Sequence, residues 1–454
     1  MADRLSARAF LALLTDDFTE LPHPGGDREP DGPLGWPGYG ALRARAAERT
    51  GETESVVCGT GHVEGVRAVL LAFEFAFLGG SLGRRTGDRL EAAYTYAREH
   101  RLPVVPLVAT GGSRMQEGML ALAQLQRVAR QSALTRRAGL PQVAVLRDPA
   151  TGGGWATLGA GADVVLALPG AQVGFAGSRV RPADADPAAY TAEAQVAAGS
   201  ADAVVPPGEL RGTLGRWLRL LTAPSDAPAP VPGPLGATDL PATGWDAVRR
   251  ARSPGRPRAG AYLDAYFTHR VALSGDRCGG TDTEGMLCGF GRHAGRTVAY
   301  AAQTGTATRP AGFRTAARLI RLADRLGIPV LTLVDTPGAA NDAEAERQGA
   351  GAAIADLFAA VASARTPVTT LVIGEGGSGG ALALAAPGDT WATPDSYFSV
   401  IAPELAAAIL KRAPAEVETT ADQLRLRPQD LADLGILRLR TGDQVFPGTG
   451  DRRS

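Results

Sequence analysis

Short apolar stretches alternate along the chain with amphipathic stretches that have the spacing of helices. PVVPLVA (103–109) and PVLTLVD (329–335) are continuous apolar runs, which is typical of strands buried on both faces of a sheet. The segments 89–100 and 313–327 carry apolar residues at three- and four-residue spacing, which predicts helices. Strands that alternate with helices in this order favour a parallel sheet with crossover helices. We therefore expect an α/β fold.

The same order of elements occurs twice. In each half the pattern predicts a strand, a helix, a second strand, a second helix and a third strand, followed by a glycine-rich loop and a further helix. The expected strands are 68–77, 103–109 and 142–148 in the first half, and 296–303, 329–335 and 368–374 in the second. The second helices are expected at 117–137 and 349–365. The repeated order predicts two domains of one fold.

Matching residues in the two halves are separated by a constant 226 positions, and internal repeats of this kind indicate duplication. The pairs are Pro103 and Pro329, Thr110 and Thr336, Gly112 and Gly338, Pro141 and Pro367, Gly153 and Gly379, Gly154 and Gly380, and Asp163 and Asp389. Between the halves, the segment 222–244 is rich in proline, alanine and glycine and has no periodicity, which is typical of a linker. We expect a first domain at 1–225, a linker at 226–244 and a second domain at 245–454.

Composition narrows the functional classes. The 454 residues are 44% hydrophobic and 21% charged with a formal net charge of zero, which indicates a soluble protein of two or three domains and argues against a nucleic-acid partner. Cys58, Cys278 and Cys288 lack metal-ligand spacing and cannot form a disulfide framework, so we expect no metal site and a reducing cytoplasm. The apolar run AVLLAFEFAFLGG is interrupted by Glu74 and is too short to span a membrane.

The loop GEGGSGG (374–380) has three interpretations. Gly374, Gly376 and Gly379 match the dinucleotide-binding fingerprint, which is a weak signal when it stands alone. Gly376, Ser378 and Gly380 match the nucleophile elbow of serine hydrolases. The third interpretation is an oxyanion hole, in which backbone N–H groups at the start of a helix bind a negatively charged oxygen.

The rest of the chain favours the oxyanion hole. A hydrolase of the elbow type needs a histidine after its serine, but the last histidine, His293, precedes Ser378. A dinucleotide loop follows the first strand of its unit, whereas these glycines follow the third, and Gly152–Gly154 lack the first two fingerprint glycines. Both loops place consecutive small residues at the start of a helix, where N–H groups have no partner within the helix.

The two halves resemble the two subunits of one known enzyme. The first half resembles the beta subunit of bacterial acetyl-coenzyme A carboxylase carboxyltransferase in VVCGTGHVEGVRAVLLAFEFAFLGGSLG, TGGSRMQEGMLAL and DPATGGGWATLGAGADVVLALPGAQVGFAGSRV. The second half resembles the alpha subunit in LTLVDTPGA, VIGEGGSGGALALA, DSYFSVIAPELAAAILKR and LRLRPQDLADLGIL. The resemblance covers about 50–180 and 245–440. It identifies the chain as a beta–alpha fusion of this family and implies a pair of crotonase-type (ClpP/crotonase) domains.

The resemblance implies a mechanism with two oxyanion holes and no strong side-chain base. In the family, carboxybiotin releases carbon dioxide, the biotin ureido nitrogen removes the α-proton of an acyl-coenzyme A, and the enolate attacks the carbon dioxide. The residues that correspond to the thioester hole are Gly152, Gly153 and Gly154, and those that correspond to the biotin hole are Gly379, Gly380 and Ala381. Further substrate contacts are expected from Gly111, Gly112, Arg114 and Gly338, with a surface ion pair to Glu117 as the alternative for Arg114.

The partners follow from what the sequence lacks. There is no CxxC pair for the zinc ribbon of the beta subunit, no ATP-binding domain and no biotinyl-lysine motif, because Lys411 lies in ILKR. We therefore expect biotin on a separate carrier protein, a separate biotin carboxylase, and an acyl-coenzyme A or acyl-carrier thioester as substrate. The family also implies a homo-oligomer with active sites between N- and C-halves. The alternatives are a biotin-independent decarboxylase of a malonyl-type thioester, or another crotonase-type enzyme such as a hydratase. A hydratase needs paired carboxylates, and only Glu375 lies near the second loop.

Overall fold

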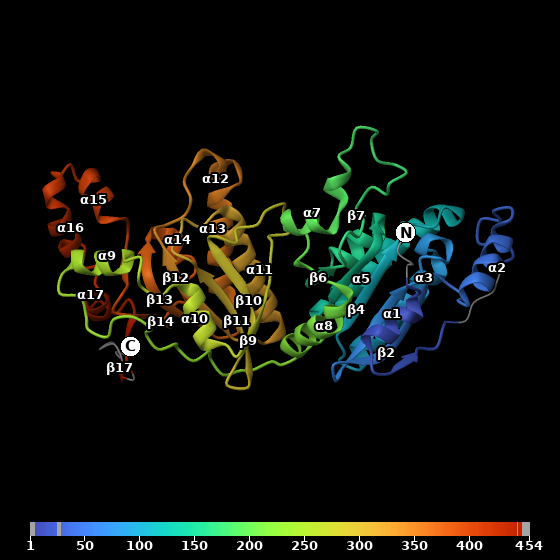
Figure 1. Ribbon diagram of the computed structural model, residues 1–454, viewed down its shortest axis with the longest axis horizontal. Coiled ribbons are helices and arrows are strands. Elements are labelled where there is room, and N and C mark those ends of the chain that lie inside the picture. Colours follow the sequence, from blue (N-terminus) through green and yellow to red (C-terminus); the bar gives the residue numbers. More distant parts are fainter. Residues whose placement is uncertain (1–4, 25–28, 443, 447–454) are drawn as a thin grey trace. The chain divides into compact units, whose positions relative to one another are not determined.

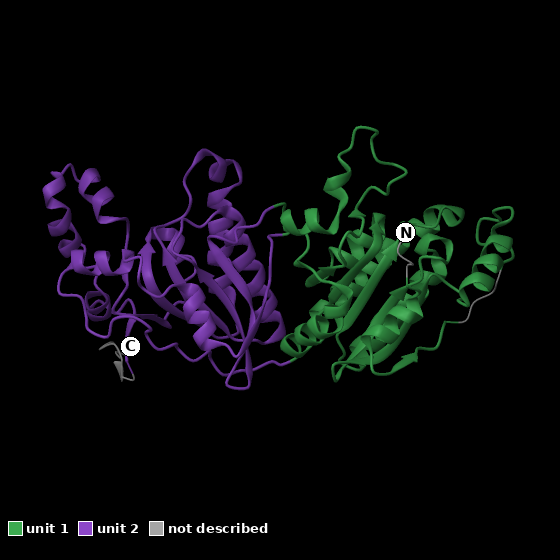
Figure 2. Ribbon diagram, in the orientation of Figure 1, with its two compact units in different colours: residues 1–222, 277–279 green, residues 223–276, 280–454 purple. Residues whose placement is uncertain are grey.

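The chain forms two compact units, which Figure 2 shows in different colours. The computed structural model describes residues 5–24, 29–442 and 444–446. Unit 1 extends to Thr222 and includes Arg277–Gly279, and unit 2 contains Ala223–Asp276 and the chain from Gly280 onwards. Each unit has its own sheet and helices (Figure 1).

The sheet of unit 1 has the order β1-β2-β3-β4-β5-β6-β8, with β7 paired to β5. β1, β2 and β3 are antiparallel, and the pairs from β3 through β6 to β8 are parallel. Its strands are β1 (Phe18–Glu20), β2 (Val56–Val63), β3 (Val66–Phe73), β4 (Val104–Thr110), β5 (Val143–Thr151), β6 (Val164–Ala167), β7 (Val173–Gly174) and β8 (Ala203–Val204).

The α-helices of unit 1 are α1 (Ala7–Leu14), α2 (Tyr39–Thr50), α3 (Arg84–Glu99), α4 (Gly118–Leu122), α5 (Gln124–Arg137), α6 (Gly152–Gly154), α7 (Ala192–Ala197) and α8 (Pro207–Leu221). Its 3-10 turns are η1 (Leu78–Gly80), η2 (Met115–Glu117) and η4 (Pro187–Tyr190), and η3 (Trp155–Gly159) is a π-helix. The single helix predicted at 117–137 is two helices that meet at Ala123. There the Gln124 side-chain amide bonds the Leu120 carbonyl (2.7 Å), which the backbone N–H of Gln124 would otherwise use.

The sheet of unit 2 has the order β17-β16-β14-β13-β12-β11-β10-β9, with β15 paired to β13. The strands from β11 to β16 are parallel, and both ends of the sheet are antiparallel. The strands are β9 (His269–Ala272), β10 (Met286–His293), β11 (Arg296–Gln303), β12 (Val330–Thr336), β13 (Val368–Gly377), β14 (Thr390–Ala392), β15 (Tyr397–Ser399), β16 (Arg438–Thr441) and β17 (Gln444–Phe446).

The helices of unit 2 begin and end where the sequence signals are clear. α11 starts with Pro310 in its first turn, and it ends at Gly327, whose left-handed φ of 66° lets its N–H bond the Ala323 carbonyl. The helices are α9 (Gly244–Arg252), α10 (Ala259–Tyr266), α11 (Pro310–Leu326), α12 (Ala343–Arg347), α13 (Ala350–Ser363), α14 (Ser378–Leu382), α15 (Pro403–Ile409), η5 (Pro414–Glu416), α16 (Val417–Gln423) and α17 (Pro428–Asp433).

The strand registers confirm the tandem duplication. Val108 pairs with Leu146 in unit 1, and Val334 pairs with Val372 in unit 2, so both partners shift by 226 positions. After a register shift, Thr110 pairs with Ala150 and Thr336 with Gly376, again with the same offset. The antiparallel hairpins that precede these strands also correspond, but with an offset of 230, because β2–β3 spans 56–73 and β10–β11 spans 286–303.

One expectation needs correction. The sequence pattern missed β2 and β10, which form antiparallel hairpins with β3 and β11, so each sheet is parallel only in its central part. The segment 226–244, expected to be a linker, groups with unit 2. Its polar backbone groups are bonded there, because Tyr266 donates to the Pro230 carbonyl (2.9 Å) and Asp395 accepts the N–H of Ala237 (2.9 Å).

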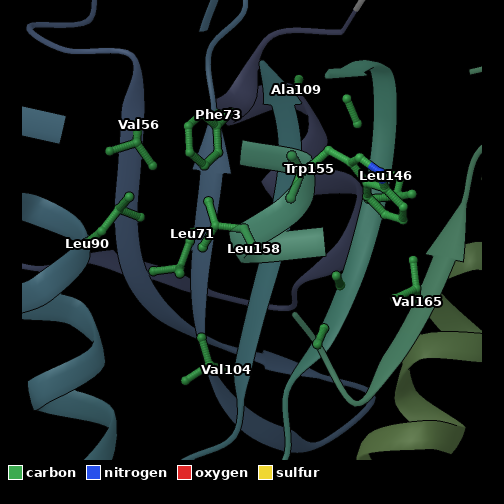
Figure 3. Close-up of a cluster of buried hydrophobic side chains, with 14 of the residues drawn as sticks. Val56, Leu71, Phe73, Leu90, Val104, Ala109, Leu146, Trp155, Leu158 and Val165 are labelled. Carbon is green, nitrogen blue, oxygen red and sulfur yellow. The ribbon is translucent and has the colours of Figure 1, made fainter. Parts of the chain in front are cut away.

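The core of unit 1 reaches the helix that follows the first glycine loop. Trp155 and Leu158 of η3 lie among apolar side chains of the sheet such as Phe73 and Leu146, as Figure 3 shows. Trp155 is 7% exposed and Leu158 is 1% exposed. The residues directly after Gly152–Gly154 are therefore anchored in the core, which fixes the position of the loop.

Candidate active site

The predicted glycine loops lie at the carboxyl ends of the central parallel strands, where ligands bind in open α/β sheets. In unit 1, Gly111–Gly112 follow β4 and Gly152–Gly154 follow β5. In unit 2, Pro337–Gly338 follow β12, and Ser378–Ala381 follow β13. Because β4 and β5 are neighbours, as are β12 and β13, the two loops of each unit leave adjacent strands.

The loops of each unit touch through their backbones. A Cβ atom on Gly152 would lie 3.1 Å from the Gly112 Cα. In unit 2, a Cβ atom on Gly380 would lie 2.6 Å from the Ala339 backbone nitrogen, and one on Gly377 would lie 2.0 Å from the Pro337 carbonyl oxygen. The structure therefore brings Gly111 and Gly112 to Gly152, and the loop at Gly338 to the start of α14. Glycine is needed at these positions because any side chain would push the two loops apart.

Hydrogen bonds show which N–H groups of unit 1 are already occupied. Gly111 donates to the Gly79 carbonyl (2.9 Å), and Gly152 donates to the Phe175 carbonyl (3.1 Å). Gly112 donates to Thr110 Oγ1 at 3.0 Å. Among the described residues, Gly153 and Gly154 have no such acceptor, and both stand in the first turn of a helix, where N–H groups lack intrahelical partners. Of the expected triplet, Gly152 is thus the member whose N–H is not available to a ligand.

The loop of unit 2 has the same geometry. Gly338 donates to Thr336 Oγ1 at 3.1 Å, as Gly112 does to Thr110. Ser378 has a left-handed φ of 58°, close to the 65° of its counterpart Gly152. Gly379 and Gly380 occupy the second and third positions of α14, where no carbonyl of the helix can accept their N–H groups. Ala381 is fourth, where the N–H ordinarily bonds the cap carbonyl.

A buried glutamine supports the second loop, and sequence reasoning missed it. Gln303, the last residue of β11, is fully buried and donates its side-chain amide to the Gly380 carbonyl (3.1 Å). Its position at the end of a strand, 77 residues before Gly380, gave no signal of this contact.

Ser378 has no activating base in the structure. No described residue forms a hydrogen bond with its hydroxyl. The nearest carboxylate along the loop, Glu375, is bonded to Arg252 (2.8 Å) and to the Tyr397 hydroxyl (2.8 Å). Burial, together with the charge of Glu375, raises the pKa of Tyr397. This arrangement orients Glu375 toward Arg252 and Tyr397 and offers no acid–base pair at the loop.

Arg114 is buried and paired within unit 1. It is 1% exposed and bonds both oxygens of Glu54, at 2.5 and 3.1 Å. It also donates to the hydroxyls of Tyr39, Ser55 and Ser81, and Glu117 lies 3.6 Å away. Burial alone would lower the pKa of Arg114, but Glu54 raises it above its ordinary value. The expected ion pair with Glu117 is therefore present, but it is buried instead of lying on the surface. Arg114 is a buried cation that holds the chain after Gly112 in place, and its burial argues against a contact with a phosphate.

Glu74 is a structural acid. Its carboxylate, 5% exposed, accepts the N–H of Ala7 at the start of α1 (2.7 Å) and that of Ala76 (2.9 Å).

The described residues contain no group of three or more His, Cys, Asp or Glu side chains placed to bind a metal ion. Within the same part of the chain, every helix is too short or too polar to cross a membrane.

Exposed apolar side chains adjoin both glycine loops. In unit 1, Met115 and Met119 are 78% and 72% exposed and lie shortly after Gly112. In unit 2, Leu382 ends α14, and Val400 follows β15, the strand that pairs with Gly376 and Gly377 of β13. Leu382 is 49% exposed and Val400 is 74% exposed. Large exposed apolar groups next to a site are typical of a surface that a partner covers.

Comparison with protein families accounts for most of the chain. Residues 240–439 match the family described as acetyl co-enzyme A carboxylase carboxyltransferase-like, and residues 38–203 match the carboxyl transferase domain. A protein of Salinispora arenicola named acetyl-coenzyme A carboxylase carboxyl transferase subunits beta/alpha is 40% identical over 98% of this chain and 82% of its own length. A Mycobacterium bovis protein named as the beta3 subunit of a biotin-dependent acyl-coenzyme A carboxylase is 35% identical over 88% of this chain and 82% of its own length.

Solved structures share the fold of the whole chain. A transcarboxylase 12S structure with methylmalonyl-coenzyme A and methylmalonic acid bound, described as a hexamer, aligns with a TM-score of 0.74 and 21% identity. The alignment covers 96% of this chain and 86% of that chain. A single-chain, multi-domain long-chain acyl-CoA carboxylase aligns with a TM-score of 0.72 and 20% identity over 96% of this chain and 45% of its own. The crotonase-type fold expected from the sequence is confirmed.

Proposed function

Because the chain belongs to the biotin-dependent acyl-coenzyme A carboxylase carboxyltransferase family, we propose that its two glycine loops are the two oxyanion holes of carboxyl transfer. The observation that supports this proposal most directly is the repetition of one loop geometry in both units. In the described part of each unit, consecutive N–H groups at the start of a helix lack an acceptor, and a second loop lies against them through close backbone contacts. Two holes suit a reaction in which two oxygens carry developing negative charge.

In unit 1, Gly153 and Gly154 are the donors to the thioester oxygen. Their N–H groups stabilise the enolate oxygen more strongly than the neutral carbonyl, because a hydrogen bond to a charged acceptor is the stronger one. Removing one donor of this kind costs on the order of 10²- to 10³-fold in rate. Gly111 and Gly112 form the facing wall, which fixes how closely the thioester approaches.

In unit 2, Gly379 and Gly380 are the donors to the ureido oxygen of biotin, with Ala381 behind them. Carboxybiotin, held on a separate carrier protein, supplies carbon dioxide and then the base that removes the α-proton of the thioester. Among the described residues, none bonds the Ser378 hydroxyl, and Glu375 is held by Arg252 and Tyr397. This agrees with the division of roles, since the chain itself then needs only to bind and orient. Gly338 forms the facing wall, as Gly112 does in unit 1.

The two oxyanion holes can serve one reaction only if the thioester bound at one lies next to the biotin bound at the other. We place each active site between an N-half and a C-half contributed by different copies of the chain. The exposed Met115 and Met119 beside the first loop, and Leu382 and Val400 beside the second, supply apolar surface for such an interface. The substrate class is an acyl-coenzyme A, as the names of the relatives indicate, and biotin carboxylase is a separate protein.

One assay tests the proposal. The purified protein is incubated with malonyl-coenzyme A, with and without free biotin, while acetyl-coenzyme A, carboxybiotin and carbon dioxide are followed. We expect acetyl-coenzyme A to form in the presence of biotin together with carboxybiotin, and methylmalonyl-coenzyme A serves as a second acyl probe. Carbon dioxide release at the same rate without biotin would overturn the proposal in favour of a biotin-independent decarboxylase.

A further inference from the structure

The neighbouring strands that carry the glycine loops lose their register at the same point in both units. In unit 2, Val334 pairs with Val372 and Thr336 with Gly376, so Asp335 alone faces three residues, 373–375. In unit 1, Ala109 faces 147–149 in the same way. Irregularities of this kind bend a strand and re-aim the residues beyond it. Here the residues beyond it are the glycine loops.

In unit 2, two charged side chains bond the backbone groups that the ladder leaves unpaired. The Asp335 carboxylate accepts the N–H of Glu375 through Oδ1 at 3.2 Å. Arg256 donates through Nη1 to the Ile373 carbonyl (3.3 Å) and through Nη2 to the same Asp335 oxygen (2.6 Å). The Asp335 side chain is 0% exposed and that of Arg256 is 4% exposed, so no solvent replaces these bonds.

The cluster also explains a glycine of the sequence motif. A Cβ atom on Gly374 would lie 2.3 Å from Arg256 Nη2 and 2.3 Å from Asp335 Oδ1. Gly374 therefore leaves room for the ion pair, which explains this glycine without a bound dinucleotide. The second Asp335 oxygen lies 3.6 Å from Arg258 Nη1, which adds a second positive charge beside the carboxylate.

Unit 1 has the same irregularity without a counterpart of the Asp335–Arg256 ion pair. Its counterpart of Glu375 is Pro149, which has no N–H to satisfy, and its counterpart of Asp335 is Ala109. Arg147, the counterpart of Ile373, directs its guanidinium elsewhere, to the carbonyls of Phe73 (3.0 Å) and Leu5. In unit 2 the N–H of Glu375 needs an acceptor, and Asp335 provides it. In unit 1 Pro149 has no N–H, so Ala109 suffices at the position of Asp335.

We propose that Asp335 and Arg256 are positioning residues of carboxyl transfer, which set the geometry of the C-half glycine loop by bonding β13 where its ladder with β12 breaks. The inference rests on the proposed role of that loop as the biotin-side oxyanion hole. Neither residue contacts the reacting atoms. Their effect passes along β13 from Glu375 to Gly379 and Gly380, whose N–H groups must point at the developing charge.

The test compares Asp335→Ala and Asp335→Asn with a matched control, Asp430→Ala. Asp430 is also buried in unit 2 and forms a two-bond pair with Arg427 (2.8 and 2.8 Å), but it lies in α17, and among the described residues its carboxylate has no bond to β12, β13 or the glycine loops. For each variant, kcat for biotin-dependent turnover of malonyl-coenzyme A, the acyl-coenzyme A Kd and the urea midpoint are measured. Loss of loop geometry by close to 1 Å costs on the order of 10²-fold, so kcat of Asp335→Ala is expected to fall by about that factor with an unchanged Kd.

Asp335→Asn keeps an acceptor for both donors and is expected to recover most of kcat. Asp430→Ala is expected to lower the urea midpoint but to keep the wild-type kcat of the folded protein. If Asp335→Ala does not fold, Arg256→Lys replaces it, because one ammonium cannot bond both Ile373 and Asp335 in this geometry. Equal kcat for the Asp335, Arg256 and Asp430 variants would overturn the inference.

A separate variant distinguishes this failure from failure of the proposed function. Gly380→Ala alters the loop itself without touching the ion pair. If Gly380→Ala loses activity and Asp335→Ala does not, only the positioning role is wrong. If Gly380→Ala keeps full activity, the oxyanion role of the loop is wrong.

Discussion

Replacing Gly380 by alanine tests whether the contact between the two loops of unit 2 sets the rate of the reaction. The new Cβ atom would lie 2.6 Å from the Ala339 nitrogen and 3.2 Å from the Ala339 Cα, and backbone atoms cannot rotate away. The loops must therefore separate by about 0.8 Å to reach the 3.4 Å at which ordinary contacts begin. Gly379, its neighbour in the same loop, offers a matched control, because a Cβ atom there would meet nothing within 4 Å.

The expected magnitudes differ widely. A misplacement of close to 1 Å costs on the order of 10²-fold in rate, which corresponds to about 2.7 kcal/mol in the barrier. The overpacked contact also costs about 1–3 kcal/mol of folding stability. Gly379→Ala is an exposed substitution in open space, so its effect on stability should stay below about 0.5 kcal/mol, and its N–H remains in place.

The assay is biotin-dependent turnover of malonyl-coenzyme A, with kcat and KM measured for both variants. Binding of acyl-coenzyme A, measured by calorimetry, should be unchanged, because the thioester site is assigned to unit 1. Thermal unfolding checks that the comparison is made on folded protein. The reasoning is refuted if folded Gly380→Ala keeps the wild-type kcat, or if Gly379→Ala loses as much activity as Gly380→Ala.

Four further predictions concern the other features of the structure. Gly153→Pro removes an N–H donor and should lower kcat on the order of 10²-fold, whereas Ser378→Ala should keep most activity; a folded but inactive Ser378→Ala in the same assay would restore the nucleophile hypothesis. Burial would raise the pKa of Glu54, but the charge of Arg114 outweighs burial and holds that pKa below its ordinary 4.5. The ionised Glu54 therefore stabilises the folded protein fully above pH 4.5, and this stabilisation is lost as the pH falls through the lower pKa of the folded state. At pH 7 the free energy of unfolding of Glu54→Gln, measured by urea titration, should therefore be about 3 kcal/mol lower than that of the wild type. This difference should become smaller below pH 4.5, and a difference that does not change with pH would contradict the pairing. Specific activity should fall on dilution in step with dissociation followed by sedimentation, and a dilute monomer with full activity would exclude sites shared between two copies.

The sequence was sufficient for features that depend on local pattern. The strand expected at 296–303 is β11, Arg296–Gln303, because a continuous apolar run next to a clear turn leaves little choice. The constant offset located both glycine loops, because the strands that precede them pair with the same offset in the two units, so the loops begin at matching positions. The hairpin strands β2 and β10 were missed, since their glycines and polar residues weaken the strand pattern that their burial supports.

The rest depended on contacts between distant parts of the chain. Arg114 was expected to contact the substrate or to form a surface ion pair with Glu117. Instead it is buried against Glu54 and Tyr39, which precede it by 60 and 75 residues. The pairing of Asp335 with Arg256 joins residues 79 positions apart. Which N–H of the triplet Gly152–Gly154 is available was likewise set by a distant carbonyl, that of Phe175. The local sequence pattern cannot predict partners that are so distant along the chain.

The change of offset from 230 to 226 divides each half into two parts. The hairpins β2–β3 and β10–β11 correspond with one spacing, and the loop-bearing strand pairs β4–β5 and β12–β13 correspond with another. The connection between hairpin and strand pair is thus four residues shorter in unit 2 than in unit 1, and both parts keep their matching registers. A chimaera of the two halves should be cut at this junction, so that each strand pair travels together with the side chains that complete its irregularity. If only the glycine loop were exchanged, its backbone N–H donors would stand on strands whose irregularity is completed by the side chains of the other half.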